Sequence, residues 1–381
     1  MKNDLQKPKV KKPVQFKDYF NSAAVEVLAH QISRIEPGFN SKQFIFSIAR
    51  DLDGLEFNAR VNRIAIGLYE HLPEDRDQAL KILRLSLPEN DVSTDSVTDG
   101  WLQWPIGQFI ANYGLSHFES SWACMLKLTK CFSAEFAIRP FVEFFPEKVI
   151  SRLFLMASSD NVHIRRLCSE AVRPYLPWGK KIEHIVKSPK QVLPIILKLS
   201  KDPEKYVQKS VGNLINDISK DHPFLAVEVA ERLLEHEHPA SSWIARRGLR
   251  TLVKKGFGPA LKLLGYASDS NISVDLKLDK KQLKIGEEIT VNLLIENLSG
   301  DEQQVLVDYL VYFVLKNGKS APKVFKWTEK KLSPLSSINL TKKHSLKQRN
   351  TKALYPGKHR LAVQINGKEF SDLSKDFYLN E

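Results

Sequence analysis

Two different periods of hydrophobic and polar positions divide the chain. From Phe16 to Tyr266, apolar residues recur at intervals of three and four, as in DYFNSAAVEVLAHQISRI, and this spacing predicts amphipathic helices. After Tyr266 the pattern changes to alternation, as in SVDLKLD and EEITVNLLIENLS, which predicts β-strands. The sequence therefore predicts an all-α region followed by an all-β region.

The predicted helices repeat along the chain. Ile164, Val207 and Ile244 each open a helix with the pattern apolar-x-basic, and their positions lie 43 and 37 residues apart. A period near 40 is typical of HEAT-type repeats, whose helical pairs stack into a curved solenoid with a concave face. In that register Arg166, Lys209 and Arg246 are equivalent, and we expect them to form a stripe of positive charge.

The alternating region predicts six or seven short antiparallel strands, which fits an immunoglobulin-like sandwich. It contains no cysteine, so a disulfide between its sheets is excluded. We expect a multidomain protein: an all-α HEAT-like repeat solenoid followed by an all-β immunoglobulin-like sandwich. The expected segments are a disordered basic arm at 1–14, a helical repeat domain at 15–267 and the sandwich at 268–381.

Composition adds a preference for a partner. The net charge of +13 and the pI near 9.4 favour a polyanion, nucleic acid first and a membrane surface second. No apolar run is long enough for a membrane span and the N-terminus lacks an apolar signal core, so we expect a soluble, cytoplasmic protein that joins the nucleoid when bound to DNA. The three cysteines show no metal spacing, and we expect no metal and no cofactor.

Two similar stretches, SAEFAIRPF (133–141) and DNVHIRRLCSEAVRPYLPWG (160–179), each place one acid before an Arg-Pro step. We expect them to be equivalent segments of neighbouring repeats, with Glu135 and Glu170 on helices and Asp217 contributed by the next repeat. Inner helices would bring the three carboxylates into one concave pocket. Basic and tryptophan residues surround them in sequence. The alternative, purely structural interpretations are that the glutamates are solvated or form ion pairs with arginine, and that Asp217 is a helix cap.

These motif blocks, together with NLINDISKDHP, resemble the DNA alkylation repair glycosylases of the HEAT-like-repeat superfamily, in particular the AlkC branch. The likeness extends over residues 15–265. The resemblance implies excision of N3-methylated and related cationic bases from DNA, with Glu135, Glu170 and Asp217 as catalytic residues and Trp178 as the lesion contact. It also implies a grip on the backbone of bent DNA, without a deep pocket for a flipped base.

The implied chemistry follows from charge. An N3-alkylated adenine already carries a positive charge, so its glycosidic bond breaks without a general acid. Carboxylates then stabilise the oxocarbenium-like sugar and orient a water molecule, and a tryptophan face binds the cationic base.

We therefore predict a monomeric glycosylase of double-stranded DNA containing alkylated bases, with no membrane association and no obligate protein partner. Its predicted DNA-binding residues are Arg139, Arg165, Arg166, Arg173, Lys209, Arg246 and Arg247. The rival interpretation is a non-catalytic HEAT scaffold that binds nucleic acid or acidic protein segments. The sequence leaves open the order of preference among N3-methyladenine, N3-methylcytosine and N1-methyladenine, and also the orientation of the sandwich.

Overall fold

The structure, a computed structural model, describes residues 15–94, 100–235, 238–267, 271–348 and 353–380. The predicted disordered arm at 1–14 lies outside these residues. The chain forms two compact units, one ending at Asp217 and one beginning at Ile218. In the described parts, every helix is too short or too polar to cross a bilayer.

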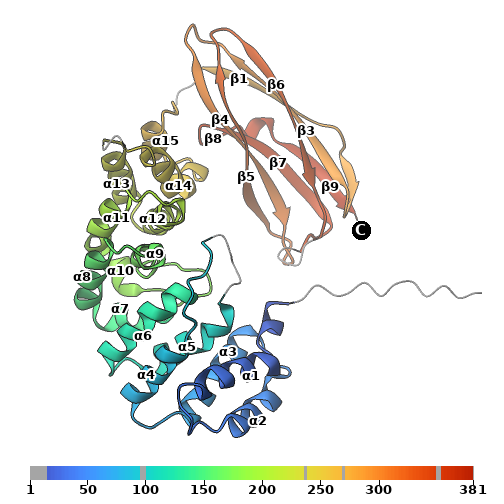
Figure 1. The fold of residues 1–381 in the computed structure, drawn as a ribbon. Coiled ribbons are helices and arrows are strands. Elements are labelled where there is room, and N and C mark those ends of the chain that lie inside the picture. Colours follow the sequence, from blue (N-terminus) through green and yellow to red (C-terminus); the bar gives the residue numbers. More distant parts are fainter. Residues whose placement is uncertain (1–14, 95–99, 236–237, 268–270, 349–352, 381) are drawn as a thin grey trace, which may run out of the picture. The chain divides into compact units, whose positions relative to one another are not determined.

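The first unit is helical (Figure 1). The α-helices are α1 (Ser22–Ser33), α2 (Ser41–Leu52), α3 (Phe57–His71), α4 (Arg76–Ser86), α5 (Trp104–Tyr113), α6 (Phe118–Cys131), α7 (Arg139–Phe144), α8 (Pro146–Met156), α9 (Val162–Glu170), α10 (Glu183–Lys187), α11 (Leu193–Leu199) and α12 (Lys205–Ile218). Single 3₁₀ turns precede α1, α5 and α11, at Phe16–Tyr19, Trp101–Gln103 and Pro189–Val192.

Helix α9 lies in the middle of this array and packs against α6, α8 and α11. Such packing of each helix on the preceding and following pairs is what a helical repeat requires. Apolar positions at three- and four-residue spacing face the interior. Phe20, Phe44, Phe109 and Phe141 are fully buried there. Ile164 and Val207, which start two copies of the apolar-x-basic pattern, both occupy the third position of their helices, α9 and α12.

The second unit combines helices with a sandwich (Figure 1). It contains α13 (Pro223–Glu235), α14 (Ser241–Lys254) and α15 (Gly258–Leu263), followed by strands. The strands are β1 (Ile272–Leu278), β2 (Gln282–Lys284), β3 (Glu288–Asn297), β4 (Gln303–Val314), β5 (Ser320–Leu332), β6 (Ser337–Ser345), β7 (Gly357–Ile365), β8 (Lys368–Glu369) and β9 (Lys375–Asn380), with a 3₁₀ turn at Ser371–Leu373. The prediction of an all-α region followed by an immunoglobulin-like all-β region is confirmed.

The strands form two sheets, one of order β1-β3-β6 and one of order β2-β9-β7-β4-β5, with β8 paired to β7. All these pairs are antiparallel except β2 with β9, which is parallel. Alternate residues of both sheets, among them Leu293, Val307, Val363 and Phe377, form one buried core. This core explains the alternation in the sequence, because successive side chains of a strand point to opposite faces.

Candidate active site

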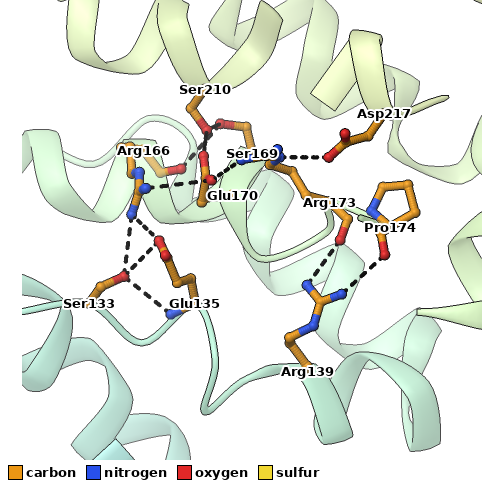
Figure 2. A network of polar contacts seen from close by, with 10 residues as sticks. All are labelled: Ser133, Glu135, Arg139, Arg166, Ser169, Glu170, Arg173, Pro174, Ser210 and Asp217. Atoms are coloured by element: carbon orange, nitrogen blue, oxygen red, sulfur yellow. Dashed lines mark hydrogen bonds and ion pairs between the residues drawn. The ribbon is translucent and has the colours of Figure 1, made fainter. Parts of the chain in front are cut away.

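Helix α9 carries the centre of the charged network (Figure 2). The side chain of Asn161 caps its start by accepting hydrogen bonds from two backbone N–H groups, at 3.0 and 3.2 Å. Arg166 and Glu170 lie four residues apart and therefore share one face of the helix. Arg173 follows in the turn after the helix ends. One short segment thus supplies two guanidinium groups and a carboxylate to the same place.

Glu170 is held by charged and polar partners, although it is only 3% exposed. Its Oε1 accepts from Arg173 Nη1 at 2.5 Å and lies 3.5 Å from Arg166 Nη2. Its Oε2 accepts from the Ser210 hydroxyl at 2.6 Å. Burial by itself raises the pKa of this carboxyl, but the two arginines and the hydroxyl outweigh it and leave the pKa below its ordinary value of 4.5. Glu170 is therefore ionised at neutral pH.

Asp217 belongs to the same network through Arg173. The Nε of Arg173 donates to Oδ2 of Asp217 at 2.8 Å, while Nη1 of the same guanidinium bonds Glu170 (Figure 2). Asp217 is 1% exposed. The structure thus brings Asp217 to Glu170 as the sequence predicted, but behind an arginine.

Glu135 approaches from another segment. It lies in the turn between α6 and α7, and its carboxylate is paired with Arg166 Nη1. The Ser133 hydroxyl donates to Glu135 Oε2 at 3.0 Å. The guanidinium of Arg166 on α9 therefore links Glu135, in this turn, to Glu170.

The predicted equivalence of the two Arg-Pro stretches is wrong. Pro140 lies in the first turn of α7, where its missing N–H costs nothing and its fixed φ favours helix. Pro174 instead follows the end of α9. Glu135 consequently precedes a helix, in a turn, whereas Glu170 ends one. The same dipeptide opens a helix in one place and follows one in the other.

A pocket of about 490 Å³ lies beside the network. Its wall contains both glutamates, Arg166 and Arg173, the exposed Lys209, and Asn213 of α12. Aromatic rings cover much of the remaining wall: Trp101, Trp104, Phe132, Phe136, Trp178 and Tyr206. Asp217 is not among the described residues that line the pocket. The arrangement joins carboxylates, cations and π-faces at one surface.

Trp178 lies at the edge of this pocket with 64% of its surface exposed. Its φ of +64° places it in the left-handed region, which costs a bulky residue about 1–3 kcal/mol. Arg139 fixes the loop on both sides, because its guanidinium donates to the carbonyl oxygens of Arg173 (2.9 Å), Pro174 (3.2 Å) and Lys180 (2.6 Å from Nε). These bonds hold the loop in a backbone conformation that Trp178 would not favour by itself.

The predicted DNA-binding residues divide by burial. Arg139 and Arg173 are buried, and their guanidinium groups bond to carbonyl and carboxylate oxygens of the protein. The prediction that these two contact phosphates does not fit this geometry, because a buried guanidinium with internal partners is not presented to a DNA backbone. They act as internal cross-links.

The other predicted DNA contacts are less enclosed. Arg165 is half-buried and pairs with Asp202 at 2.6 Å. Arg166 forms ion pairs with Glu135 and Glu170. Lys209 is exposed. In the second unit, the exposed Arg246 donates to the Tyr266 hydroxyl at 3.0 Å, and Arg247 lies 5.4 Å from the centre of the Trp243 ring. The stripe of Arg166, Lys209 and Arg246 remains a prediction.

Sequence reasoning missed three polar residues of the site. Ser210 bonds Glu170, Ser133 orients Glu135, and Tyr206 lies with its ring 5.4 Å from the Arg166 guanidinium carbon. A signal for two of them was present, because Tyr206, Ser210, Asn213 and Asp217 recur at helical spacing along α12. A serine or tyrosine in a sequence does not by itself indicate a functional site, although its hydroxyl can complete the hydrogen bonding of a buried carboxylate.

Comparison with known proteins places the chain. Residues 128–252 match the family model described as DNA alkylation repair enzyme, and residues 273–381 match the C-terminal Ig-like domain described for the uncharacterised protein YhaZ. Protein YhaZ of Bacillus subtilis (strain 168) is 36% identical over 354 residues, which cover 92% of this chain and 96% of that protein. The chain belongs to the DNA alkylation repair family.

Within this family, the AlkC-like branch indicated by the sequence motifs is confirmed. The alkylpurine DNA glycosylase AlkC of Pseudomonas fluorescens, solved bound to DNA containing an abasic site analog, is 29% identical. It superimposes with a TM-score of 0.88, and the match covers 97% of this chain and 100% of that one. The family and this likeness together support a DNA repair glycosylase.

Proposed function

We propose that this member of the alkylation repair family is a DNA glycosylase that hydrolyses the N-glycosidic bond of cationic alkylated bases, of the N3-methyladenine and N3-methylcytosine type. Its place in base excision repair is removal of the damaged base, which leaves an abasic site. The likeness to an alkylpurine glycosylase solved with abasic DNA supports the reaction, and the pocket beside Glu135 and Glu170 is where we assign it.

The observation that carries this proposal is the pairing of the buried Glu170 carboxylate with cationic side chains. Two arginines and a serine hydroxyl keep its pKa low, so it has no proton to give to a leaving base at neutral pH. A neutral adenine leaves poorly without such a proton. An N3-alkylated base needs none, because bond cleavage converts the cationic base into a neutral leaving group. A pocket with ionised carboxylates therefore selects bases that are already charged.

The carboxylates then act on the sugar and the water. As the C1′–N bond breaks, positive charge develops at C1′, and a fixed negative charge nearby stabilises it. We assign this electrostatic role to the buried Glu170. The more exposed Glu135, held by Ser133 and Arg166, is assigned the orientation of the water whose oxygen attacks C1′. The proton released by this water passes to a carboxylate or to solvent.

Trp178 is the proposed lesion contact. Its exposed ring borders the pocket, and the π-face of tryptophan attracts a cation by about 1–2 kcal/mol when both are desolvated. A neutral base gains less from that face. Leaving-group charge and cation binding thus favour the same class of lesion.

Base release from methylated duplex DNA tests the proposal. Glu135→Gln and Glu170→Gln keep the shape of the side chain and one acceptor oxygen but remove the charge, and we expect each to slow release of N3-methyladenine by at least about a hundredfold. Glu147→Gln alters an exposed carboxylate of α8 outside the pocket and serves as the matched control. Circular dichroism and DNA binding show that the variants fold.

The rival interpretation, a non-catalytic scaffold with structural ion pairs, makes the opposite prediction. The arginine partners of both glutamates are what a scaffold would also contain. If the wild-type protein releases no methylated base from DNA that it binds, the glycosylase assignment is lost. If both glutamine variants release base at the wild-type rate, the catalytic roles of Glu135 and Glu170 are lost.

A further inference from the structure

A second pocket of about 530 Å³ also borders Trp178. It shares Trp104, Phe136 and Trp178 with the carboxylate pocket, so the two pockets adjoin at these aromatic side chains. Glu135 and Glu170 do not line it. The proposed hydrolysis leaves this second pocket without a role.

One wall of the second pocket is a row of side-chain amides. Gln108 of α5 donates to Asn112 Oδ1 at 2.8 Å, and Asn112 donates to Asn62 Oδ1 of α3 at 3.0 Å. Asn58, one helical turn before Asn62, lines the same wall. A primary amide has two N–H donors and an oxygen with two lone pairs, so these bonds use only part of its capacity. The row can still pair with a donor and an acceptor on one planar edge.

Two exposed aromatic side chains border the same pocket. Phe144, in α7, is 67% exposed, and Trp178 is 64% exposed. Large aromatic surfaces on a monomer call for a partner. Flat rings beside amide groups fit a nucleobase, which stacks on the ring faces and presents donors and acceptors on its edge.

The charges at the rim agree with a nucleotide. Lys180 and Lys181 line the pocket, and Lys181 also pairs with Glu183 at 3.1 Å. One acid, Glu143, lines the pocket too, where it accepts a backbone N–H at 3.3 Å. An exposed lysine beside an aromatic and amide cavity suits the phosphate that accompanies each base.

We propose that this pocket binds one undamaged nucleobase of the DNA, unstacked next to the lesion, with its edge on Gln108 and Asn112 and its face on Phe144 or Trp178. The inference rests on the proposed function for its DNA substrate. Because the two pockets share a wall, lesion and second base are close neighbours in the DNA. The second base would stabilise the bend that exposes the damaged nucleotide.

The test combines protein variants with base deletions, using DNA that carries an uncleavable abasic analogue in place of the lesion. 2-Aminopurine is placed in turn at each position within three nucleotides of the analogue on either strand. At one position we expect a strong fluorescence change on binding, which locates the occupant. Asn112→Ala or Gln108→Ala should then weaken binding about fivefold. When the base at that position is deleted, the same variants should have no effect.

Gln78→Ala removes an exposed amide of α4 outside both pockets and controls for a general loss of amides. A fluorescence change at no position, or an equal loss of affinity with and without the base, overturns the subsite. Base release from methylated DNA is measured separately on the same preparations. If the wild-type protein releases methylated base but the Asn112 and Gln108 variants show no base-dependent loss of DNA affinity, only the subsite is rejected. If the wild-type protein releases no methylated base, the glycosylase assignment is rejected.

Discussion

Arg173 lies between two carboxylates and reaches Asp217 through Nε at a distance of 2.8 Å, with both side chains buried. The other edge of the same guanidinium bonds Glu170. Asp217 can therefore influence the pocket without lining it, because it fixes the plane of Arg173 and hence the carboxylate that Arg173 holds. We regard Asp217 as a positioning residue.

Asp217→Asn should separate positioning from folding. Removing one charge of a buried pair should lower the free energy of unfolding by about 2 kcal/mol. It should also reduce kcat for base release on the order of tenfold through the displaced Glu170, with a smaller change in KM. Asp202→Asn breaks a comparable buried pair with Arg165, away from the pocket. If both variants lose stability and only Asp217→Asn loses kcat, positioning is supported; equal kcat values would contradict it.

The lowered pKa of Glu170 predicts a pH dependence of stability. A carboxylate whose pKa is lower in the folded state than its ordinary 4.5 stabilises the fold fully above that value, and the benefit is lost as pH falls through the folded pKa. The difference in unfolding free energy between wild type and Glu170→Gln should thus be constant from pH 7 to pH 5.5. It should shrink only below about pH 4.5.

Urea unfolding at stepped pH values measures this difference. Glu147→Gln, with its exposed carboxylate, should differ little from wild type at every pH. A wild-type advantage that already declines between pH 7 and 5.5 would show that burial, rather than the arginines, controls Glu170.

Trp178 should act through its π-face. Trp178→Leu keeps an apolar side chain but removes the ring, and it should lower kcat/KM for N3-methyladenine about tenfold, from a cation–π contribution of about 1–2 kcal/mol. Trp178→Phe should lose less. Since the side chain is largely exposed, neither variant should change the melting temperature by more than a few degrees. Equal kcat/KM for the leucine and wild-type proteins would remove Trp178 from the lesion contact.

Periodicity was enough to predict the fold classes, since both the three-and-four spacing and the alternation reflect burial on one face. The parallel pairing of β2 with β9 departs from the predicted antiparallel strands, because it joins residues 282–284 to 378–380, which no local pattern records. The sequence predicted structure best where it depends on local periodicity, and least well where a strand pairs with a strand that is distant in the sequence.

The same limit applies to the site. Acids in unusual contexts marked Glu135 and Glu170, and the repeat spacing added Asp217. Arg139 was predicted to bind DNA because it is one of the basic residues that surround the carboxylates in the sequence. Its actual acceptors are backbone carbonyls 34 to 41 residues away. Burial converts such a cation into a structural clamp, and burial of a single residue depends on the tertiary fold.

Gly256 and Gly367 meet closely within the second unit, where the turn between α14 and α15 touches the turn between β7 and β8. Both have positive φ, +70° and +78°. A Cβ added at Gly367 would lie 2.4 Å from the Cα of Gly256 and 2.6 Å from Leu261 Cδ1. Asn366 reinforces the junction by donating to the Ala267 carbonyl at 2.9 Å. This contact attaches the sandwich to helices α14 and α15 at a point where only glycine fits.

Gly367→Ala should therefore weaken that attachment. Gly318→Ala is the matched control, because Gly318 has a similar φ of +74° but no atom within 4 Å of the added Cβ. Both variants carry the cost of a left-handed alanine, about 1 kcal/mol. Only Gly367→Ala adds a backbone clash, so it should unfold at a lower temperature and show faster proteolysis in the segment between α15 and β1. Identical melting and cleavage of the two variants would mean that the glycine contact does not hold the sandwich to the helices.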